Sequence, residues 1–211
     1  PAPALAPPTL SVTFALMRRP SNSQGGSDET VTPELIERCK AGDESAWRSL
    51  VEATQRDVYT LCLRILRDPD DAAEATQETY VKVWRGLGSF RGDAMFTTWL
   101  YRVASNAAIS KQRSRKRRRT HETGGDETLM QLTAPGSLET EAAARMDVRL
   151  LEKCVEKLPE HYRSVVVLRD VYGLSIDEIA TRLKISETAT KVRLHRARKK
   201  LKEMMYPEDS P

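Results

Sequence analysis

The stretch that decides the fold is SETATKVRLHRARKKL, residues 186–201. Seven Lys or Arg lie between residues 191 and 202, and the only acid in residues 186–201 is Glu187. Helical spacing predicts a narrow apolar stripe made of Thr190, Leu194, Ala197 and Leu201. The opposite face presents Thr188, Lys191, Val192, His195 and Lys199, with Arg196 at its edge. Such a helix fits the major groove of DNA, which is about 12 Å wide.

The residues before this run predict a partner helix. Ser175 and Glu178 have the spacing of a capping box, and Ser186 is placed to cap the basic helix. A helix, a tight turn at 184–186 and a basic second helix form a helix-turn-helix, which is typical of DNA binding. The alternative is a helical hairpin whose charges are only solvated. The lack of acidic residues on the outer face favours DNA binding over this alternative.

Composition limits the function classes. The chain has 211 residues, 39% of them apolar, and a formal net charge of +4. No stretch approaches the ~20 apolar residues of a membrane span, so we expect no membrane insertion and a cytoplasmic location. Three cysteines and three histidines are scattered and match no metal pattern, and no nucleophile–base pair or Gly-rich phosphate loop is present. We therefore expect that this protein is not an enzyme and that it binds neither a metal nor a cofactor.

The chain is expected to be all-α, with two small helical domains joined by a flexible acidic linker. Proline, Ser and Gly in residues 1–30 predict a disordered tail. The first domain covers 31–117, a linker with acids and turn signals covers 118–144, the second domain covers 145–205, and 206–211 form a tail. No strand alternation and no repeat is present.

The first domain combines an acidic helix and a basic one. The helix that starts at Asp68-Pro69 is expected to bury Ala73, Thr76, Tyr80, Trp84 and Leu87. Its outer side carries Asp70, Asp71, Glu74 and Glu78, which suits a basic partner surface. Asp93 is expected to cap a fourth helix from residue 94 to about 115. Seven of the nine residues 111–119 are basic, which favours a second phosphate-binding surface over a solvated tail.

Two blocks of sequence resemble the extracytoplasmic-function sigma factors of the sigma-70 superfamily. DPDDAAEATQETYVKVW (68–84), FRGDA (90–94) and TWLYRVASN (98–106) are similar to region 2 of that family. LPE (158–160) and the run to KVRLHRAR (191–198) are similar to region 4. The resemblance covers roughly residues 34–203.

The resemblance implies a non-catalytic subunit that binds bacterial core RNA polymerase and promoter DNA, and an anti-sigma factor as a further partner. It implies core-polymerase contacts at Asp71, Glu74, Gln77, Glu78 and Trp84. It implies that the melted −10 element, with one base extruded, is read by the fourth helix and the loop before it. The −10 candidates are Phe90, Arg91, Asp93, Asn106, Lys111, Arg113 and Arg115. A packing hydrogen bond is the other interpretation of Asn106.

The same resemblance assigns the −35 element to the basic helix. The candidates are Thr188, Lys191, Val192, Arg193, His195, Arg196 and Lys199, while Arg198, Lys199 and Lys200 are expected to hold phosphates. Val192 departs from the family, which commonly has a Ser there, and a valine can contact a thymine methyl but cannot donate to a phosphate. A stand-alone, dimeric helix-turn-helix regulator remains the alternative, although it leaves the acidic helix and Asn106 without a role.

Overall fold

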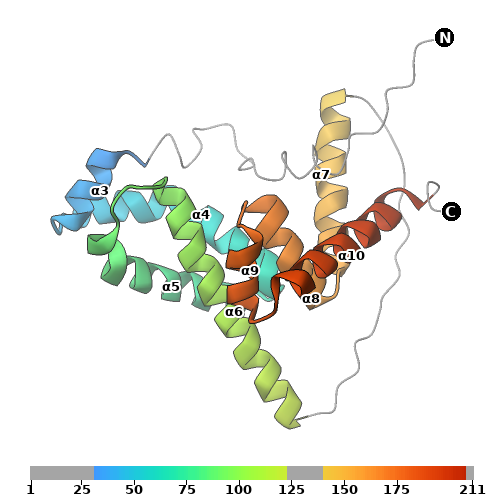
Figure 1. The fold of residues 1–211 in the computed structure, drawn as a ribbon. Helices are drawn as coiled ribbons and strands as arrows, with labels where there is room; N and C mark the ends of the chain where they lie inside the picture. Colours follow the sequence, from blue (N-terminus) through green and yellow to red (C-terminus); the bar gives the residue numbers. More distant parts are fainter. Residues whose placement is uncertain (1–30, 123–139, 208–211) are drawn as a thin grey trace. The chain divides into compact units, whose positions relative to one another are not determined.

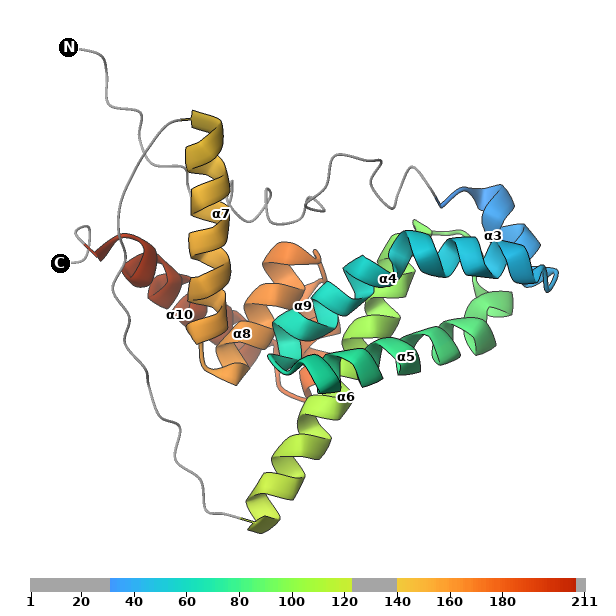
Figure 2. The ribbon, with the colours of Figure 1, turned by 180° about the vertical axis from the view of Figure 1, so that it is seen from behind.

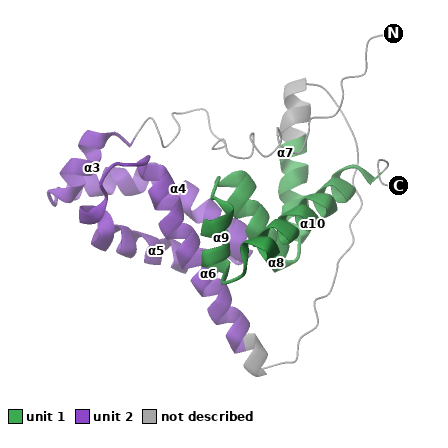
Figure 3. Cartoon of the chain, viewed as in Figure 1, with its two compact units in different colours: residues 1–19, 127–211 green, residues 20–126 purple. Residues whose placement is uncertain are grey.

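The computed structural model describes residues 31–122 and 140–207, and within these ranges every regular element is helical (Figures 1 and 2). The tail at 1–30 and the central part of the linker, 123–139, lie outside the described residues. The helices form two compact units, coloured separately in Figure 3, and each is built around its own core. The first holds α3 to α6 and the second holds α7 to α10.

The first unit is built on three helices that contact one another in pairs. They are α4 (Glu44–Leu66), α5 (Pro69–Gly86) and α6 (Phe96–Glu122), and the short α3 (Pro33–Lys40) packs on α4. A 3-10 turn, η1 (Leu87–Ser89), follows α5. The largest fully buried side chains of this unit are Leu50, Val58, Leu61, Ile65, Leu66, Leu100 and Ile109.

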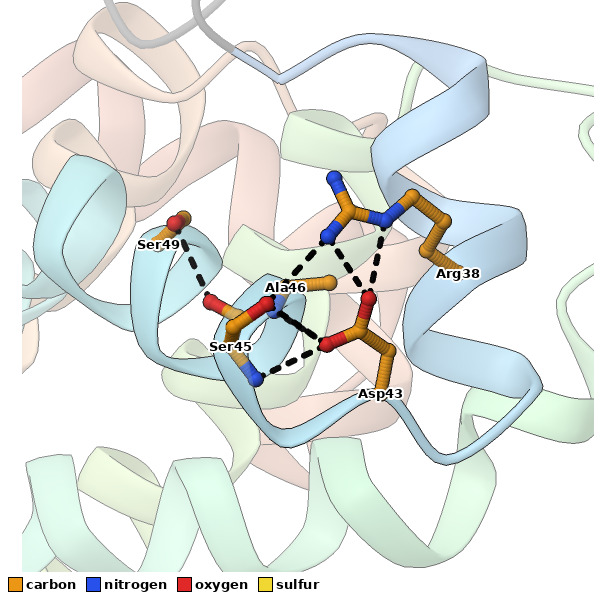
Figure 4. A network of polar contacts seen from close by, with 5 residues as sticks. All are labelled: Arg38, Asp43, Ser45, Ala46 and Ser49. Atoms are coloured by element: carbon orange, nitrogen blue, oxygen red, sulfur yellow. Dashed lines mark hydrogen bonds and ion pairs between the residues drawn. The ribbon is translucent and has the colours of Figure 1, made fainter.

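Side-chain caps explain where the first helices begin. Thr32 caps α3 with Pro33 in its first turn, and Gly42 ends the turn that follows with a φ of 85°. Asp43 then accepts hydrogen bonds from the backbone N–H groups of Ser45 and Ala46. Figure 4 shows that the same carboxylate also receives the guanidinium of Arg38. This ionised cap therefore joins α3 to α4.

The packing side of α5 differs from the one expected. Its buried residues are Ala72, Ala75, Thr79 and Val83, while Trp84 is 51% exposed. The buried positions lie one residue earlier than expected, because α5 packs against both α4 and α6 and these two contacts set its rotation; Leu87, which was also expected to be buried, is buried. Tyr80 and Trp84 lie at the rim, where the Tyr80 hydroxyl pairs with Thr54 at 2.8 Å.

The fourth helix of this unit, α6, is longer than the expected 94–115. It begins at Phe96, two residues later than predicted, with the carbonyl of Met95 accepting from Trp99 at 3.2 Å. Asp93 therefore does not cap it. The helix continues to Glu122, and its last turns project beyond α4 and α5 in Figures 1 and 2. Residues 118–122 and 140–144, expected in the linker, belong to α6 and α7.

The second unit places the basic helix over three others. These are α7 (Thr140–Lys157), α8 (Glu160–Val166) and α9 (Ile176–Leu183), and α10 (Glu187–Met205) packs on all three. A π-helical turn, η2 (Val167–Val171), continues α8. Ser175 and Glu178 form the expected capping box, and Ser186 caps α10. The helix-turn-helix arrangement of α9 and α10 is confirmed, with its core at Leu151, Leu158, Leu168, Ile179 and Leu201.

Candidate nucleic-acid and protein interfaces

The outward face of α10 is exposed and basic. Its buried stripe is Thr190, Leu194, Ala197, Leu201 and Met205, which includes all four residues expected from the spacing. The exposed residues on the other side are Thr188, Lys191, Val192, His195, Arg196 and Lys199. We call this set the α10 face. Arg193 lies apart from it and is half-buried beside the stripe.

The charges of the α10 face remain available to a partner. Lys191 lies 3.8 Å from Glu187, and Lys199 lies 3.9 Å from Glu203, each one helical turn away. Exposed pairs of this kind are worth at most about 1 kcal/mol, so phosphates compete with them easily. Val192 is an apolar side chain, 42% exposed, among these charges. The α10 face therefore offers cations that can bind phosphates and, at Val192, an apolar side chain that can make a van der Waals contact.

Arg198, by contrast, is engaged inside its own unit. Its guanidinium donates to both carboxylate oxygens of Asp170 in η2, with 3.0 Å from Nε to Oδ2. The Asp170 side chain is only 9% exposed. The side chain thus fastens α10 to η2, and the expected phosphate role of Arg198 stays a prediction with which this ion pair competes.

On α6, two of the predicted DNA-binding residues face α5. Lys111 donates to Glu74 and lies 3.4 Å from Asp71. Arg115 reaches Asp71 at 3.1 Å and Asp68 at 3.9 Å. The hydrogen bond to Glu74 is the main cause that raises the pKa of the Lys111 ammonium. Residues predicted for two different partners are thus paired with each other.

The remaining basic residues of α6 divide by exposure. Arg113 is half-buried, whereas Lys116, Arg117 and Arg118 are exposed on the turns that project from the unit. Asn106 is also exposed, and its side chain makes no hydrogen bond with the residues that the structure describes. The packing interpretation of Asn106 therefore lacks support.

The outer face of α5 is acidic at one end and apolar at the other. Glu74 and Gln77 are exposed, and Glu78 is half-exposed with Lys82 at 2.6 Å. Beyond them lie Val81, 49% exposed, and Trp84, whose ring meets Trp47 edge-on at 4.9 Å. We call Glu74, Gln77, Glu78, Val81 and Trp84 the α5 face. Sequence reasoning missed Val81, although it lies four residues after Gln77 and three before Trp84.

Asp71, the fifth predicted polymerase contact, is not part of the α5 face. Its side chain is 17% exposed and is held between Lys111 and Arg115. Reversing its charge would place a third cation beside those two and disturb the packing of α6 on α5, so the predicted polymerase contact at Asp71 is not tested cleanly by charge reversal.

The loop between η1 and α6 is supported by aromatic rings. Phe90 packs against Phe96 and Trp99 at centroid distances of 5.6 and 5.4 Å. Arg91 and Asp93 are exposed on it. Together with α3, this loop encloses a pocket of about 500 Å³ lined by Ile36, Lys40, Phe90, Arg91, Asp93 and Met95. Asn106 does not line this pocket.

The described residues contain no cluster of His, Cys, Asp or Glu that could hold a metal ion. The cysteines Cys39, Cys62 and Cys154 are buried free thiols, and burial raises the pKa of each, for Cys62 to about 11. No helix in the described part of the chain is long and apolar enough to cross a membrane.

Each of the two units matches the sequence model of a known protein family, and these matches define the class of protein. Residues 50–118, the greater part of the first unit, match the model of sigma-70 region 2. Residues 148–201, which hold the helix-turn-helix, match the model of sigma-70 region 4. The two units therefore correspond to regions 2 and 4 of the sigma-70 family.

Full-length relatives define the group within that class. The RNA polymerase sigma-H factor of Pseudomonas aeruginosa is 33% identical over 82% of this chain and 93% of the relative. The ECF RNA polymerase sigma factor SigW of Bacillus subtilis is 31% identical over 84% of this chain and 98% of the relative. The chain belongs to the extracytoplasmic-function sigma factors, which direct RNA polymerase to promoters.

A solved structure agrees in fold. The sigma factor RpoE of Bartonella quintana, in complex with the anti-sigma factor NepR, matches with a TM-score of 0.51 and 21% identity. The match covers 77% of this chain and 98% of that one. These comparisons do not favour the stand-alone regulator, because both units match sigma regions and not the helix-turn-helix alone.

Proposed function

We propose that the α5 face docks on core RNA polymerase and that α6 and α10 read the two promoter elements. The observation that carries the proposal is the α5 face itself. Exposed tryptophan beside exposed valine is costly in water, and Trp is enriched among the residues that dominate protein interfaces. The acidic end of the face fits a basic partner surface. Val81 joins the predicted polymerase contacts in this proposal.

For the −35 element we propose that the α10 face enters the major groove. Lys191 and Lys199 neutralise phosphates, whereas Arg196, His195 and Val192 are placed to contact base edges. Arg193, half-buried at the side of the helix, reaches the backbone at the rim of the groove. Arg198 positions the helix through Asp170 and makes no DNA contact in this scheme.

For the −10 element we propose that Asn106, Phe90, Arg91 and Asp93 read the melted strand. An amide offers both donors and an acceptor to a base edge, which suits a base extruded from the duplex. The exposed cations Lys116, Arg117 and Arg118 hold the phosphates, with Arg113 beside them. Lys111 and Arg115, which face α5, stabilise the packing of α6 in the free protein.

In this proposal the chain performs no chemistry of its own and works in the cytoplasm, where the polymerase is found. The polymerase supplies the catalytic site, and the sigma factor supplies docking and promoter selection. An anti-sigma factor is proposed as a further partner, supported by the complex in which the Bartonella quintana relative was solved. Covering either the α5 face or the α10 face would be enough to inhibit this chain.

The test combines the purified chain with bacterial core polymerase. We expect co-migration on gel filtration and run-off transcripts from defined start sites. Glu78→Lys should weaken co-migration, because it reverses a charge of the α5 face. Glu52→Lys, an equal charge change at an exposed position of α4, is the matched control. Normal co-migration of Glu78→Lys would contradict the docking surface, and the absence of any specific transcript would contradict the assignment as a whole.

A further inference from the structure

Glu74 belongs to two sets of contacts. It is the acidic end of the α5 face, and it also accepts a hydrogen bond from Lys111 of α6. The two side chains differ in access to solvent, since Glu74 is 67% exposed and Lys111 only 13%. A partner that approaches α5 therefore reaches the carboxylate without first meeting the ammonium.

We propose that polymerase docking takes Glu74 away from Lys111, and that Lys111 then binds a phosphate of the promoter strand held by α6. The inference rests on the proposed docking at the α5 face and names how that docking is coupled to DNA binding. Glu74 is the shared residue, Lys111 the residue released, and the competing ligands are a cation of the polymerase and a DNA phosphate.

The neighbouring pairs explain why only Lys111 is released. Arg115 and Lys111 both contact Asp71, whose side chain is 17% exposed and out of reach of a partner. Arg115 has no contact with the exposed Glu74 and so keeps Asp71, its nearer acceptor, when the polymerase docks. Lys111 retains Asp71 at 3.4 Å but loses its nearer acceptor.

The position of Lys111 on α6 suits a phosphate contact. It lies one to two helical turns before the exposed Lys116 and Arg117, and between these cations and Asn106. Five residues of α-helix rise about 7.5 Å and turn by about 140°, so Lys111 lies on the flank of α6 next to α5 and would contact a strand that passes along that flank. Thermodynamic linkage makes the effect reciprocal: if polymerase docking raises the affinity for DNA by some factor, DNA binding raises the affinity for polymerase by the same factor.

The free chain provides the first test. Its affinity for a fluorescein-labelled single-stranded DNA of mixed sequence is measured by anisotropy over a range of NaCl concentrations. Removing Glu74's charge by Glu74→Gln should tighten binding about two- to fivefold, the range of one weak ion pair. It should also steepen the salt slope by about 0.7, the value for one extra phosphate on a single strand.

Two variants separate this release from a general charge effect. Glu52→Gln removes the same charge at an exposed position of α4 and should leave the salt slope unchanged. Lys111→Met in the Glu74→Gln background should cancel the gain. If Glu74→Gln behaves like Glu52→Gln, or if its gain survives Lys111→Met, the proposed release is wrong.

Polymerase provides the second test and distinguishes the coupling from the docking. Lys111→Met should leave the salt slope of the free chain unchanged and should reduce the slope of holoenzyme on a promoter by about 0.7. If Lys111→Met changes the salt slope equally in the free chain and in the holoenzyme, the proposed coupling is wrong. Glu74→Gln should also weaken binding to core polymerase. If it weakens core binding without changing DNA binding, the docking surface stands and the coupling fails; unchanged core binding rejects Glu74 as the shared residue.

Discussion

Arg198 of α10 and Asp170 of η2 form a two-point ion pair, although twenty-eight residues separate them in the sequence. The Asp170 side chain is almost buried, and that of Arg198 is about half exposed. Asp170 lies within the π-helical turn η2, a kind of turn that is rare and often found at functional sites. The pair fixes how α10 lies on the rest of its unit.

The unequal burial of this pair predicts unequal costs of removing either partner. Arg198→Ala leaves an almost buried carboxylate without its cation and should lower the free energy of unfolding by about 2 kcal/mol. Asp170→Ala leaves a half-exposed guanidinium that water can solvate, so the loss should be about 1 kcal/mol. Urea unfolding at neutral pH measures both values.

Lys199→Ala is the matched control for Arg198→Ala. Its side chain is exposed, so the change in stability should stay within about 0.5 kcal/mol. The salt slope of DNA binding should show the reverse order, falling by about 0.9 for Lys199→Ala and little for Arg198→Ala. A large slope change with Arg198→Ala would show that Arg198 contacts a phosphate.

Trp84 should dominate polymerase docking. Truncating an interface tryptophan commonly costs about 2 kcal/mol or more, which is roughly a thirtyfold loss of affinity. We expect this for Trp84→Ala, and a smaller loss for Val81→Ala, in a competition assay for core polymerase. Circular dichroism and urea unfolding check that the unit remains folded. Wild-type affinity of Trp84→Ala would place the docking surface elsewhere.

Val192 should read a thymine methyl. In holoenzyme, we expect one −35 position where deoxyuridine in place of thymine weakens binding about fourfold, the effect of one buried methyl at ~0.8 kcal/mol. Val192→Ala should be equally weak with either base at that position, because the methyl contact is already lost. Equal sensitivity of the two proteins at every position would exclude this contact.

The capping network at Asp43 should make the first unit sensitive to acid. Hydrogen bonds from Ser45 and Ala46, followed by that from Arg38, hold the pKa of this carboxyl well below its usual range. A carboxyl whose pKa is lower in the folded than in the unfolded chain stabilises the fold. This stabilisation is complete above the pKa of the unfolded state, near 4, and is lost as the pH falls through the pKa of the folded state. Asp43→Ala should therefore lower the thermal midpoint at neutral pH.

The difference in thermal midpoint between the wild type and Asp43→Ala should narrow steadily below about pH 4, the pKa of an aspartate in an unfolded chain. Asp43→Asn keeps an oxygen that can cap α4 but loses the charge that Arg38 meets, so it should fall between the wild type and Asp43→Ala. A difference between wild type and Asp43→Ala that is independent of pH would show that the charge of the cap contributes nothing.

The three cysteines should be unreactive in the folded chain. Burial raises the pKa of each thiol, and the thiolate is the reactive form. We expect no rapid reaction with a disulfide reagent at mild alkaline pH, and three thiols to react after unfolding in urea. Rapid reaction of Cys39 or Cys154 in the native protein would contradict this prediction and indicate an accessible, reactive thiol.

The sequence by itself determined the helix-turn-helix, the caps at Ser175 and Ser186 and the two basic regions, because these depend on local spacing. The capping box at Ser175 and Glu178 and the stripe from Thr190 to Leu201 required no knowledge of distant contacts. The same is true of the family, since motifs such as the run at 68–84 are contiguous in the chain.

Only the tertiary structure decided which charges remain available to partners. Lys111 and Glu74 are thirty-seven residues apart, and nothing local indicates that they pair. The same holds for Arg198 with Asp170, and for the one-residue shift that buries Ala72 and exposes Trp84. Each depends on how closely two helices approach and at what rotation, and those quantities are set by packing between elements and not by the pattern within one.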